Sequence, residues 1–279
     1  MFAPAACVPA RLNVHNRKKT QKDGSTVHPF LPCRGAFYPF ELGKGEEKKP
    51  FLLCDGRMPQ EMREKLTALG QVIALPPYER LPLPVCGHPD LLCFYDGAVL
   101  YTFKEYYEEN RGIFEDLPCK IRPLDIRAGA YPRDLPFDQL LFCNAMIGRE
   151  EFVPPELKDG RRMLSVKQGY AKCSALVFDG HMITADRGIA ASGRILGGKV
   201  LEIEAGGIAL EGYNTGFIGG ASGVVGKNVL FFGSLSCHPQ GKEIKAFVSL
   251  AGYEAMELSE GPLVDHGGLL VIPWQGNGL

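Results

Sequence analysis

The stretch that decides the fold is Ala175-Leu-Val-Phe-Asp-Gly-His-Met-Ile-Thr184, in which two short apolar runs flank the pair Asp179-Gly180. A tight hairpin turn needs positive φ at both central positions, and Asp-Gly adopts that backbone readily. A helix candidate and another short apolar strand follow. The stretch therefore predicts one β-β-α-β unit.

The same pattern recurs on both sides of this unit. Leu91–Tyr95 and Ala98–Tyr101 flank a second Asp-Gly pair, and a weaker version places Val229–Phe232 after Gly-Lys-Asn. A spacing of roughly 35 to 50 residues between units is typical of structural repeats. Such units begin near His88, Gln139, Cys173 and Ala221.

The helix and last strand of a unit are clearest near the C-terminus. Lys242–Ala251 carries apolar side chains on one helical face, and Ala255–Leu258 reads as the next strand. The poorest match is the unit over 135–169, where the expected helix is about one turn long, near Pro155–Lys158.

The two ends of the regular region predict a fifth unit. Phe51–Cys54 reads as a buried strand, Pro59 opens a helix that stops at Gly70, and Gln71–Leu75 reads as the next strand. The apolar strand Gly268–Pro273 begins a unit that it does not finish. Pairing of these two ends would close a ring and remove exposed strand edges.

Composition narrows the class of protein. The chain has 279 residues, 45% of them hydrophobic, and a net charge of -1. We therefore expect no nucleic-acid partner. No apolar run approaches the roughly 20 residues of a membrane helix, and no secretory signal is visible, so we expect a cytoplasmic protein. Its oligomeric state is left open.

The cysteines and histidines predict neither a disulfide framework nor a metal site. The nine cysteines are scattered, mostly within apolar runs, which is typical of buried thiols in a reducing compartment. No CxxC occurs, and the six histidines lack metal-ligand spacing. We expect no metal and no cofactor.

The domain organisation is one domain with an extension. Residues 1–48 are rich in proline and basic residues, without a helix or strand period, and are interpreted as a partly disordered accessory extension. Residues 49–279 are interpreted as a single α/β domain.

Five short segments carry a resemblance to a known family: GHPD (87–90), QGYAKCS (168–174), ITADRGI (183–189), GFIGGASG (216–223) and GPLVDHGG (261–268). With them the sequence resembles a clostridial-type family of uncharacterised proteins assigned to the pentein fold. That fold is a ring of five β-β-α-β units, shared by guanidine-modifying enzymes and a ribosome anti-association factor. The resemblance implies a pentein domain with a central cleft, and it brings no established activity.

The resemblance also implies where a nucleophile would lie. Pentein enzymes take their catalytic cysteine from the last unit, shortly after a glycine-rich turn. The matching stretch here is His266-Gly-Gly-Leu-Leu-Val271, and no cysteine follows Cys237. Ordinary arginine deiminase or dimethylarginine hydrolase activity is therefore not expected, and the chain reads as a pseudoenzyme.

In the pentein arrangement the unit starts converge on one cleft. Its polar residues would bind a small cationic or amphoteric ligand, with Asp90 or Asp265 pairing with a positive group. The candidate ligand-binding residues are His88, Asp90, Lys172, Ser174, Ser222, Asp265 and His266.

Two other functions stay open. The first is an atypical hydrolase acting on a guanidine, amidine or amide, with Cys173 as nucleophile, its thiol pKa lowered by Lys172, and His88 or His266 as general base. A buried structural thiol is the competing interpretation of Cys173. The second is a macromolecular interaction scaffold resembling the ribosome factor, against which the near-neutral charge counts.

Overall fold

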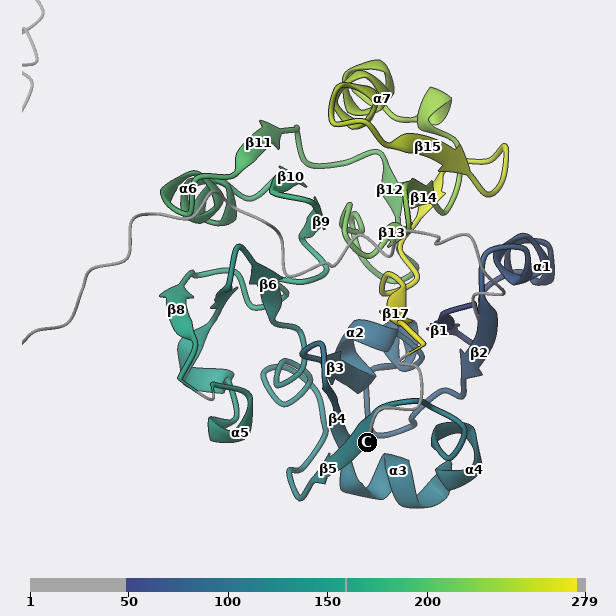
Figure 1. Ribbon diagram of the computed structural model, residues 1–279, viewed down its shortest axis with the longest axis vertical. Coiled ribbons are helices and arrows are strands. Elements are labelled where there is room, and N and C mark those ends of the chain that lie inside the picture. The colour runs from purple at the N-terminus through teal and green to yellow at the C-terminus, as the bar shows by residue number, and fades with distance from the viewer. Residues whose placement is uncertain (1–48, 159, 275–279) are drawn as a thin grey trace, which may run out of the picture. The chain divides into compact units, whose positions relative to one another are not determined.

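The computed structural model describes residues 49–158 and 160–274; the expected extension, 1–48, lies outside these ranges. The described chain contains five separate three-stranded sheets and one two-stranded sheet. Each three-stranded sheet pairs two strands antiparallel and adds a third parallel to the middle one. Figure 1 shows most helices on the outer sides of their own sheets, whereas the short helix α2 (Pro89–Leu92) lies near the centre.

Unit 1 joins the two ends of the described chain. Its middle strand β1 pairs antiparallel with β17 and parallel with β2, as the sequence predicts. Its elements are β1 (Phe51–Asp55), α1 (Gln60–Thr67), β2 (Gln71–Leu75) and β17 (Leu270–Ile272).

Units 2 and 3 follow in the chain, with a short 3-10 turn, η1 (Leu83–Val85), before them. Unit 2 consists of α2 (Pro89–Leu92), β3 (Cys93–Tyr95), β4 (Val99–Phe103), α3 (Lys104–Glu109), α4 (Arg111–Phe114) and β5 (Lys120–Leu124). Unit 3 consists of β6 (Leu140–Phe142), β7 (Ala145–Gly148), η2 (Glu150–Phe152), α5 (Pro155–Lys158) and β8 (Arg162–Ser165).

Units 4 and 5 complete the set. Unit 4 consists of β9 (Ala175–Phe178), β10 (His181–Thr184), α6 (Arg187–Ile195) and β11 (Lys199–Glu202). Unit 5 consists of β13 (Ser222–Val225), β14 (Asn228–Phe231), η3 (Leu235–Cys237), α7 (Gly241–Leu250) and β15 (Glu254–Glu257). The two-stranded sheet pairs β12 (Ile208–Ala209) with β16 (Leu263–Val264) in parallel.

The hairpin that decides the fold has the expected turn. Asp179 and Gly180 both have positive φ, 39° and 72°, and β9 and β10 have the predicted bounds. The hairpin of unit 2 differs at its start, because Pro89–Leu92 forms a helical turn and β3 begins only at Cys93. Proline at the first helical position and Asp90 in the first turn favour that helix over a strand.

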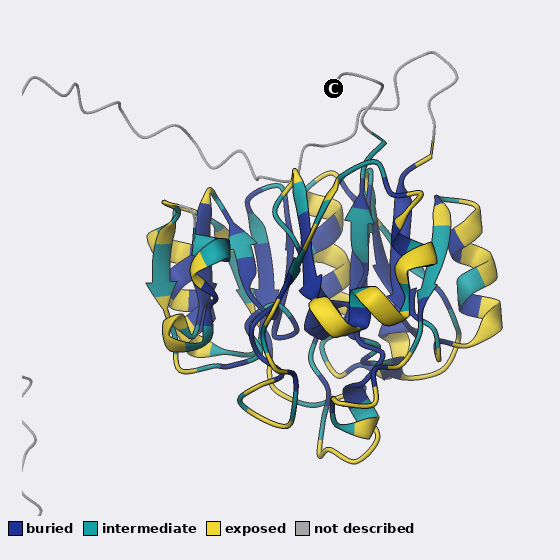
Figure 2. Cartoon of the chain, turned by 90° about the horizontal axis from the view of Figure 1, so that it is seen from below, coloured by how far each residue is buried: buried dark blue, intermediate teal, exposed yellow. Residues whose placement is uncertain are grey.

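Apolar side chains fill the spaces between neighbouring units. One core includes residues of units 1, 2 and 3, and others join unit 3 to 4, unit 4 to 5 and unit 5 to 1. At the last junction, Leu52 and Met62 pack in one core with Leu230. Figure 2 shows the strands mostly buried and the outer helix faces exposed. The units therefore share continuous cores rather than folding independently.

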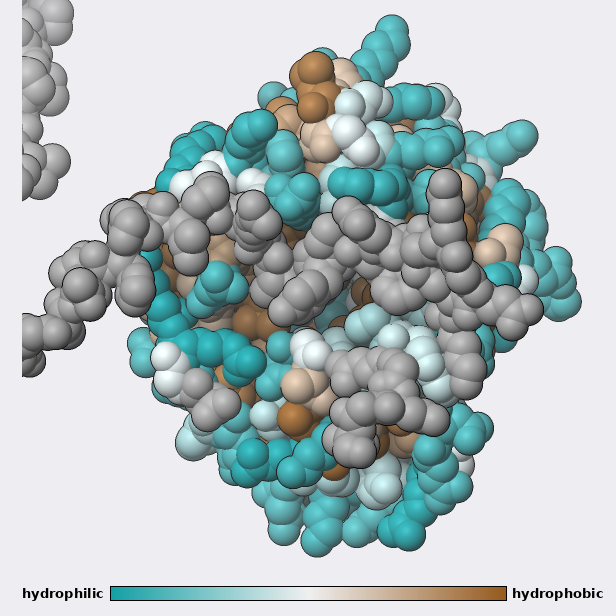
Figure 3. Space-filling view, viewed as in Figure 1, coloured by the Kyte–Doolittle hydropathy of each residue, from teal (hydrophilic) through white to brown (hydrophobic). Residues whose placement is uncertain are grey.

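The surface carries scattered apolar side chains. Figure 3 shows hydrophilic side chains around most of the face in view, with smaller apolar patches between them. The exposed large hydrophobics, in separate segments, are Leu83, Tyr131, Ile195, Tyr213 and Leu250. Among the described residues, no helix is long and apolar enough to cross a membrane.

The described cysteines are mostly free thiols, as expected. The free cysteines are Cys54, Cys86, Cys93, Cys119, Cys173 and Cys237. Cys143 is disulfide-bonded, so the expectation of free thiols fails at this position.

Candidate functional site

The starts of the units are joined by backbone hydrogen bonds. Asp90 N–H donates to Gly267 O over 3.3 Å, which links unit 2 to the loop before β17. His266 N–H donates to Gly220 O, and Gly220 N–H donates to Cys173 O, each over 3.0 Å. Residues far apart in the chain thus come together at one place.

The side chains of Asp138 and Asp90 connect the starts of units 2, 3 and 4 through hydrogen bonds. Asp138 Oδ1 accepts from the backbone N–H of Lys172 at 2.5 Å and of Cys173 at 3.0 Å, which joins unit 3 to unit 4. The Cys173 thiol donates to Asp90 Oδ2 over 2.8 Å and joins unit 4 to unit 2.

Two glycines make this close approach of backbones possible. A Cβ on Gly220 would overlap the Asp265 carboxylate, and a Cβ on Gly267 would overlap His88. Gly267 also has a φ of 72°, which L side chains rarely adopt. The glycines of GFIGGASG and HGG therefore serve packing at the site as well as turns.

Three buried carboxylates, Asp90, Asp138 and Asp265, form what we call the carboxylate cluster. Their residues are 4%, 0% and 2% exposed. Both oxygens of Asp265 have a hydrogen-bond donor, since they accept from the N–H groups of Phe217 and Gly267 at 2.9 and 3.0 Å. Among the described residues, Asp90 Oδ1 and Asp138 Oδ2 have no hydrogen-bond partner. Such orphaned buried acceptors are costly unless a ligand or water pairs with them.

Burial makes the neutral form of these acids favourable. It is the main cause that raises the pKa of Asp138 to about 7 and that of Asp265 to about 6. Burial, followed by the charge of Asp138, raises the pKa of Asp90 well above its usual range. The Lys172 ammonium opposes all three shifts. A cation entering the cluster would favour the ionised carboxylates.

Both predicted histidines lie at the site in neutral form. Burial lowers the pKa of His88 to about 3 and also lowers the pKa of His266. His88 Nδ1 lies 3.8 Å from Asp265 Oδ1, too far for a hydrogen bond, and has no other partner among the described residues. The unpartnered Nδ1 of the neutral His88 imidazole is thus available to a ligand inside the site.

Cys173 is not the activated thiol that the hydrolase interpretation requires. It is 4% exposed, and burial together with the charges of Asp90, Asp265 and Asp138 raises its pKa well above the usual value. The expected lowering by Lys172 is therefore wrong, because three carboxylates lie around the thiol. The sulfur of Cys173 is a hydrogen-bond donor in this state.

The two predicted serines differ in whether their hydroxyl groups have a hydrogen-bond partner. Ser222 Oγ donates to Ile218 O at 2.6 Å, so its hydroxyl proton is used within the fold. Ser174 Oγ, by contrast, is buried with no partner among the described residues and lines a cavity.

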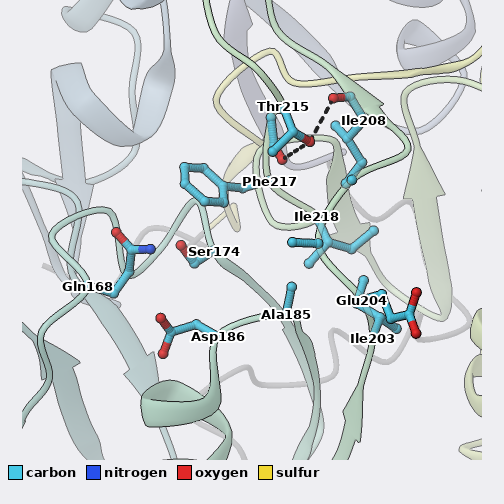
Figure 4. Close-up of a pocket in the computed structure, with 13 residues that line it drawn as sticks. Gln168, Ser174, Ala185, Asp186, Ile203, Glu204, Ile208, Thr215, Phe217 and Ile218 are labelled. Carbon is cyan, nitrogen blue, oxygen red and sulfur yellow. Dashed lines mark hydrogen bonds between the residues drawn. The ribbon is translucent and has the colours of Figure 1, made fainter.

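That cavity has a volume of about 210 Å³ and is lined by residues in and near unit 4 and by the segment 203–218, which leads to unit 5. Figure 4 shows Gln168, Ser174 and Asp186 on one side of it and Ile208 and Ile218 on the other. Its lining combines an apolar wall with acidic and amide groups.

A group of possible metal ligands lies within the site. One ligand atom each from His88, Asp90 and Cys173 can be chosen so that all lie within 4.8 Å of one another. The absence of metal-ligand spacing in the sequence therefore does not exclude a metal site built from separate units.

Sequence reasoning missed Asp138. Its position in the unit could have identified it. Asp138 lies two residues before β6, much as Asp90 lies three residues before β3. Because the strand and helix pattern of unit 3 is weak in the sequence, the matching positions of Asp138 and Asp90 were not recognised.

Comparisons with known proteins give low structural likeness and one family. A dimethylarginine dimethylaminohydrolase, solved as an adduct with 4-chloro-2-hydroxymethylpyridine, is 12% identical, with a TM-score of 0.46 over 76% of this chain and 92% of that chain. Another, from Pseudomonas aeruginosa in complex with citrulline, is 11% identical, with a TM-score of 0.43 over the same shares. Agmatine deiminase from C. jejuni is 10% identical, with a TM-score of 0.33 over 76% of this chain and 71% of that chain.

These similarities are too low to assign a reaction. Among curated proteins, no sequence matches significantly. A family profile, however, matches residues 53–270, most of the chain. The chain therefore belongs to the family of unknown function DUF6873.

Proposed function

We propose that this protein is a pentein-like domain whose five units close into a ring, and that it binds a small cationic ligand at the carboxylate cluster without cysteine chemistry. The antiparallel pairing of β1 with β17 supports the ring. So do the shared cores, which run from each unit to the next and from unit 5 back to unit 1. The clostridial origin and the cytoplasmic location stay predictions.

The observation that carries the binding proposal is the pair of orphaned oxygens. Asp90 Oδ1 and Asp138 Oδ2 are buried and have no partner in the described chain. A cation between them would supply the missing interactions and pair buried negative charge. Lys172 offers one such charge to the whole cluster, and a ligand would add a second.

The thiol argues against the hydrolase alternative. A nucleophilic cysteine needs a positive environment that favours the thiolate. Cys173 instead lies among carboxylates and donates its proton to Asp90. The interaction scaffold stays a prediction, and no contact at this site favours it.

Thermal unfolding tests the proposal. The full chain would be heated with arginine, agmatine, methylammonium, Mg²⁺ or Zn²⁺, each over a range of concentrations. We expect at least one of these cations to raise Tm saturably, because a ligand that binds the folded state stabilises it.

The matched control is an exposed acid. Asp90→Asn and Asp138→Asn should lose the response, whereas Glu260→Gln, which removes an exposed negative charge, should keep it. Absence of stabilisation by every cation, or an undiminished response in both cluster variants, would overturn the proposal.

A further inference from the structure

We propose that His88, Asp90 and Cys173 form a binding site for a thiophilic divalent metal ion, with Zn²⁺ as the best fit. This inference rests on the proposed cation binding and names the class of cation. The three residues come from the starts of units 2 and 4 and are 2%, 4% and 4% exposed.

The spacing of the donor atoms suits a metal ion. One atom from each residue lies within 4.8 Å of the others. In a tetrahedral zinc site, with bonds of about 2.0 to 2.3 Å, ligand atoms are about 3.3 to 3.8 Å apart. Cys173 Sγ and Asp90 Oδ2, at 2.8 Å, would move slightly apart to admit an ion.

The elements hold these donors in place. His88 and Asp90 flank Pro89, whose ring fixes the backbone at the start of α2. The backbone N–H of Cys173 is tied to Asp138 Oδ1. These supports correspond to the surrounding hydrogen bonds that orient ligands in metal sites.

Orphaned atoms point to a missing partner. His88 Nδ1 and Asp90 Oδ1 are buried and have no hydrogen-bond partner among the described residues. Asp265 Oδ1 lies 3.8 Å from His88 Nδ1, so another carboxylate is at hand for the ion or for the imidazole N–H. The site thus combines closely spaced ligand atoms with buried polar atoms that have no partner among the described residues.

The donor set selects the kind of ion. An imidazole nitrogen, a carboxylate oxygen and a sulfur suit Zn²⁺, whereas Mg²⁺ and Ca²⁺ prefer oxygen ligands alone. On binding, the zinc–sulfur bond forms and the Cys173 S–H bond breaks; the thiol proton, and the proton of Asp90 where its carboxyl is neutral, leave to water. The doubly charged ion would pair the buried carboxylates around it.

Isothermal titration calorimetry of the chain with Zn²⁺ tests the site, in a Cys237→Ser background that removes the one free cysteine classed as exposed among the described residues. We expect one equivalent to bind. Cys173→Ser and His88→Ala should each weaken binding at least about tenfold. Cys93→Ser, which changes a buried thiol elsewhere, should leave the affinity unchanged.

Co²⁺ gives a spectroscopic readout in addition to the measured affinity. In the same background, bound Co²⁺ should show thiolate-to-metal charge-transfer absorption, which Cys173→Ser abolishes. Equal Zn²⁺ affinity in Cys173→Ser, or Co²⁺ binding without that absorption, would overturn the metal site. If agmatine or arginine stabilises the chain while Zn²⁺ does not bind, the metal inference fails and the proposed cation binding stands. If no cation binds, both fail.

Discussion

The thiol of Cys173 donates its hydrogen to Asp90 Oδ2 over 2.8 Å, across 83 residues of sequence. The contact fixes the thiol in its protonated form beside a carboxyl group that is itself buried. A cysteine that serves as a nucleophile would be paired with a base or a cation instead. The arrangement suits the binding of a positive charge better than covalent attack.

Alkylation should distinguish the two kinds of thiol in this chain. Burial and neighbouring carboxylates raise the pKa of Cys173, so its thiolate is scarce at neutral pH. We expect iodoacetamide to modify the exposed Cys237 rapidly at pH 7 and Cys173 only on unfolding. Mass spectrometry of each peptide provides the measurement. Rapid labelling of Cys173 below pH 7 would restore the hydrolase hypothesis.

Asp138→Ala should destabilise the fold. The substitution leaves the backbone N–H groups of Lys172 and Cys173 without their acceptor. Leaving the buried N–H of Cys173 and the half-buried N–H of Lys172 unpaired costs about 2 to 4 kcal/mol in the free energy of unfolding. Asp138→Asn keeps an acceptor oxygen and should cost much less. Urea denaturation measures both, and equal losses in the two variants would contradict this role for Asp138.

Gly220→Ala should be poorly tolerated. The new Cβ would overlap the Asp265 carboxylate, whose oxygens are held by two backbone N–H groups. Overpacking of this kind costs about 1 to 3 kcal/mol. The control is Gly261→Ala, where nothing lies within 4 Å of the added Cβ. A thermal unfolding curve that is unchanged for Gly220→Ala would refute the close approach.

Asp134 should make stability depend on pH. Its carboxyl is buried and accepts from Tyr170 Oη at 2.7 Å, while burial, the larger effect, raises its pKa above the ordinary 3.8. Between 3.8 and the raised pKa the folded state holds a proton that the unfolded state has released. The contribution of Asp134 to stability therefore falls as pH rises through this window.

The quantity to measure is the difference in the free energy of unfolding between the wild type and Asp134→Asn as a function of pH, because other groups titrate in both proteins. Relative to Asp134→Asn, the wild type should lose free energy of unfolding as pH rises from about 4. A difference that is independent of pH, or that grows in the opposite direction, would show that burial does not control this carboxyl.

Local signals in the sequence predicted much of the fold. The Asp179-Gly180 turn, strand β2 and the one-turn helix Pro155–Lys158 were predicted with the bounds that the structure shows. Each depends on neighbours in the chain. The prediction failed at Leu91 and Leu92, where the helix-starting sequence His-Pro-Asp extends a helical turn through residues that resemble a strand.

The chemistry of the site could be predicted only in part. Positions at the unit starts identified His88, Asp90 and Asp265, but the state of Cys173 depends on Asp90 and Asp138, which lie 83 and 35 residues away. The adjacent Lys172 suggested a lowered thiol pKa, and the distant carboxylates reverse it. The burial and the neighbouring charges that set the pKa of this thiol arise only when the units pack together.

The most direct test of the central claim is urea denaturation of Asp90→Asn beside the wild type, with and without the cation that stabilises the wild type on heating. Because burial raises the pKa of Asp90 and so favours its neutral carboxyl group, a neutral amide should replace it at a cost within about 1 kcal/mol. The account predicts that the cation then raises the free energy of unfolding of the wild type alone. An equal gain in both proteins would contradict a cation site at Asp90.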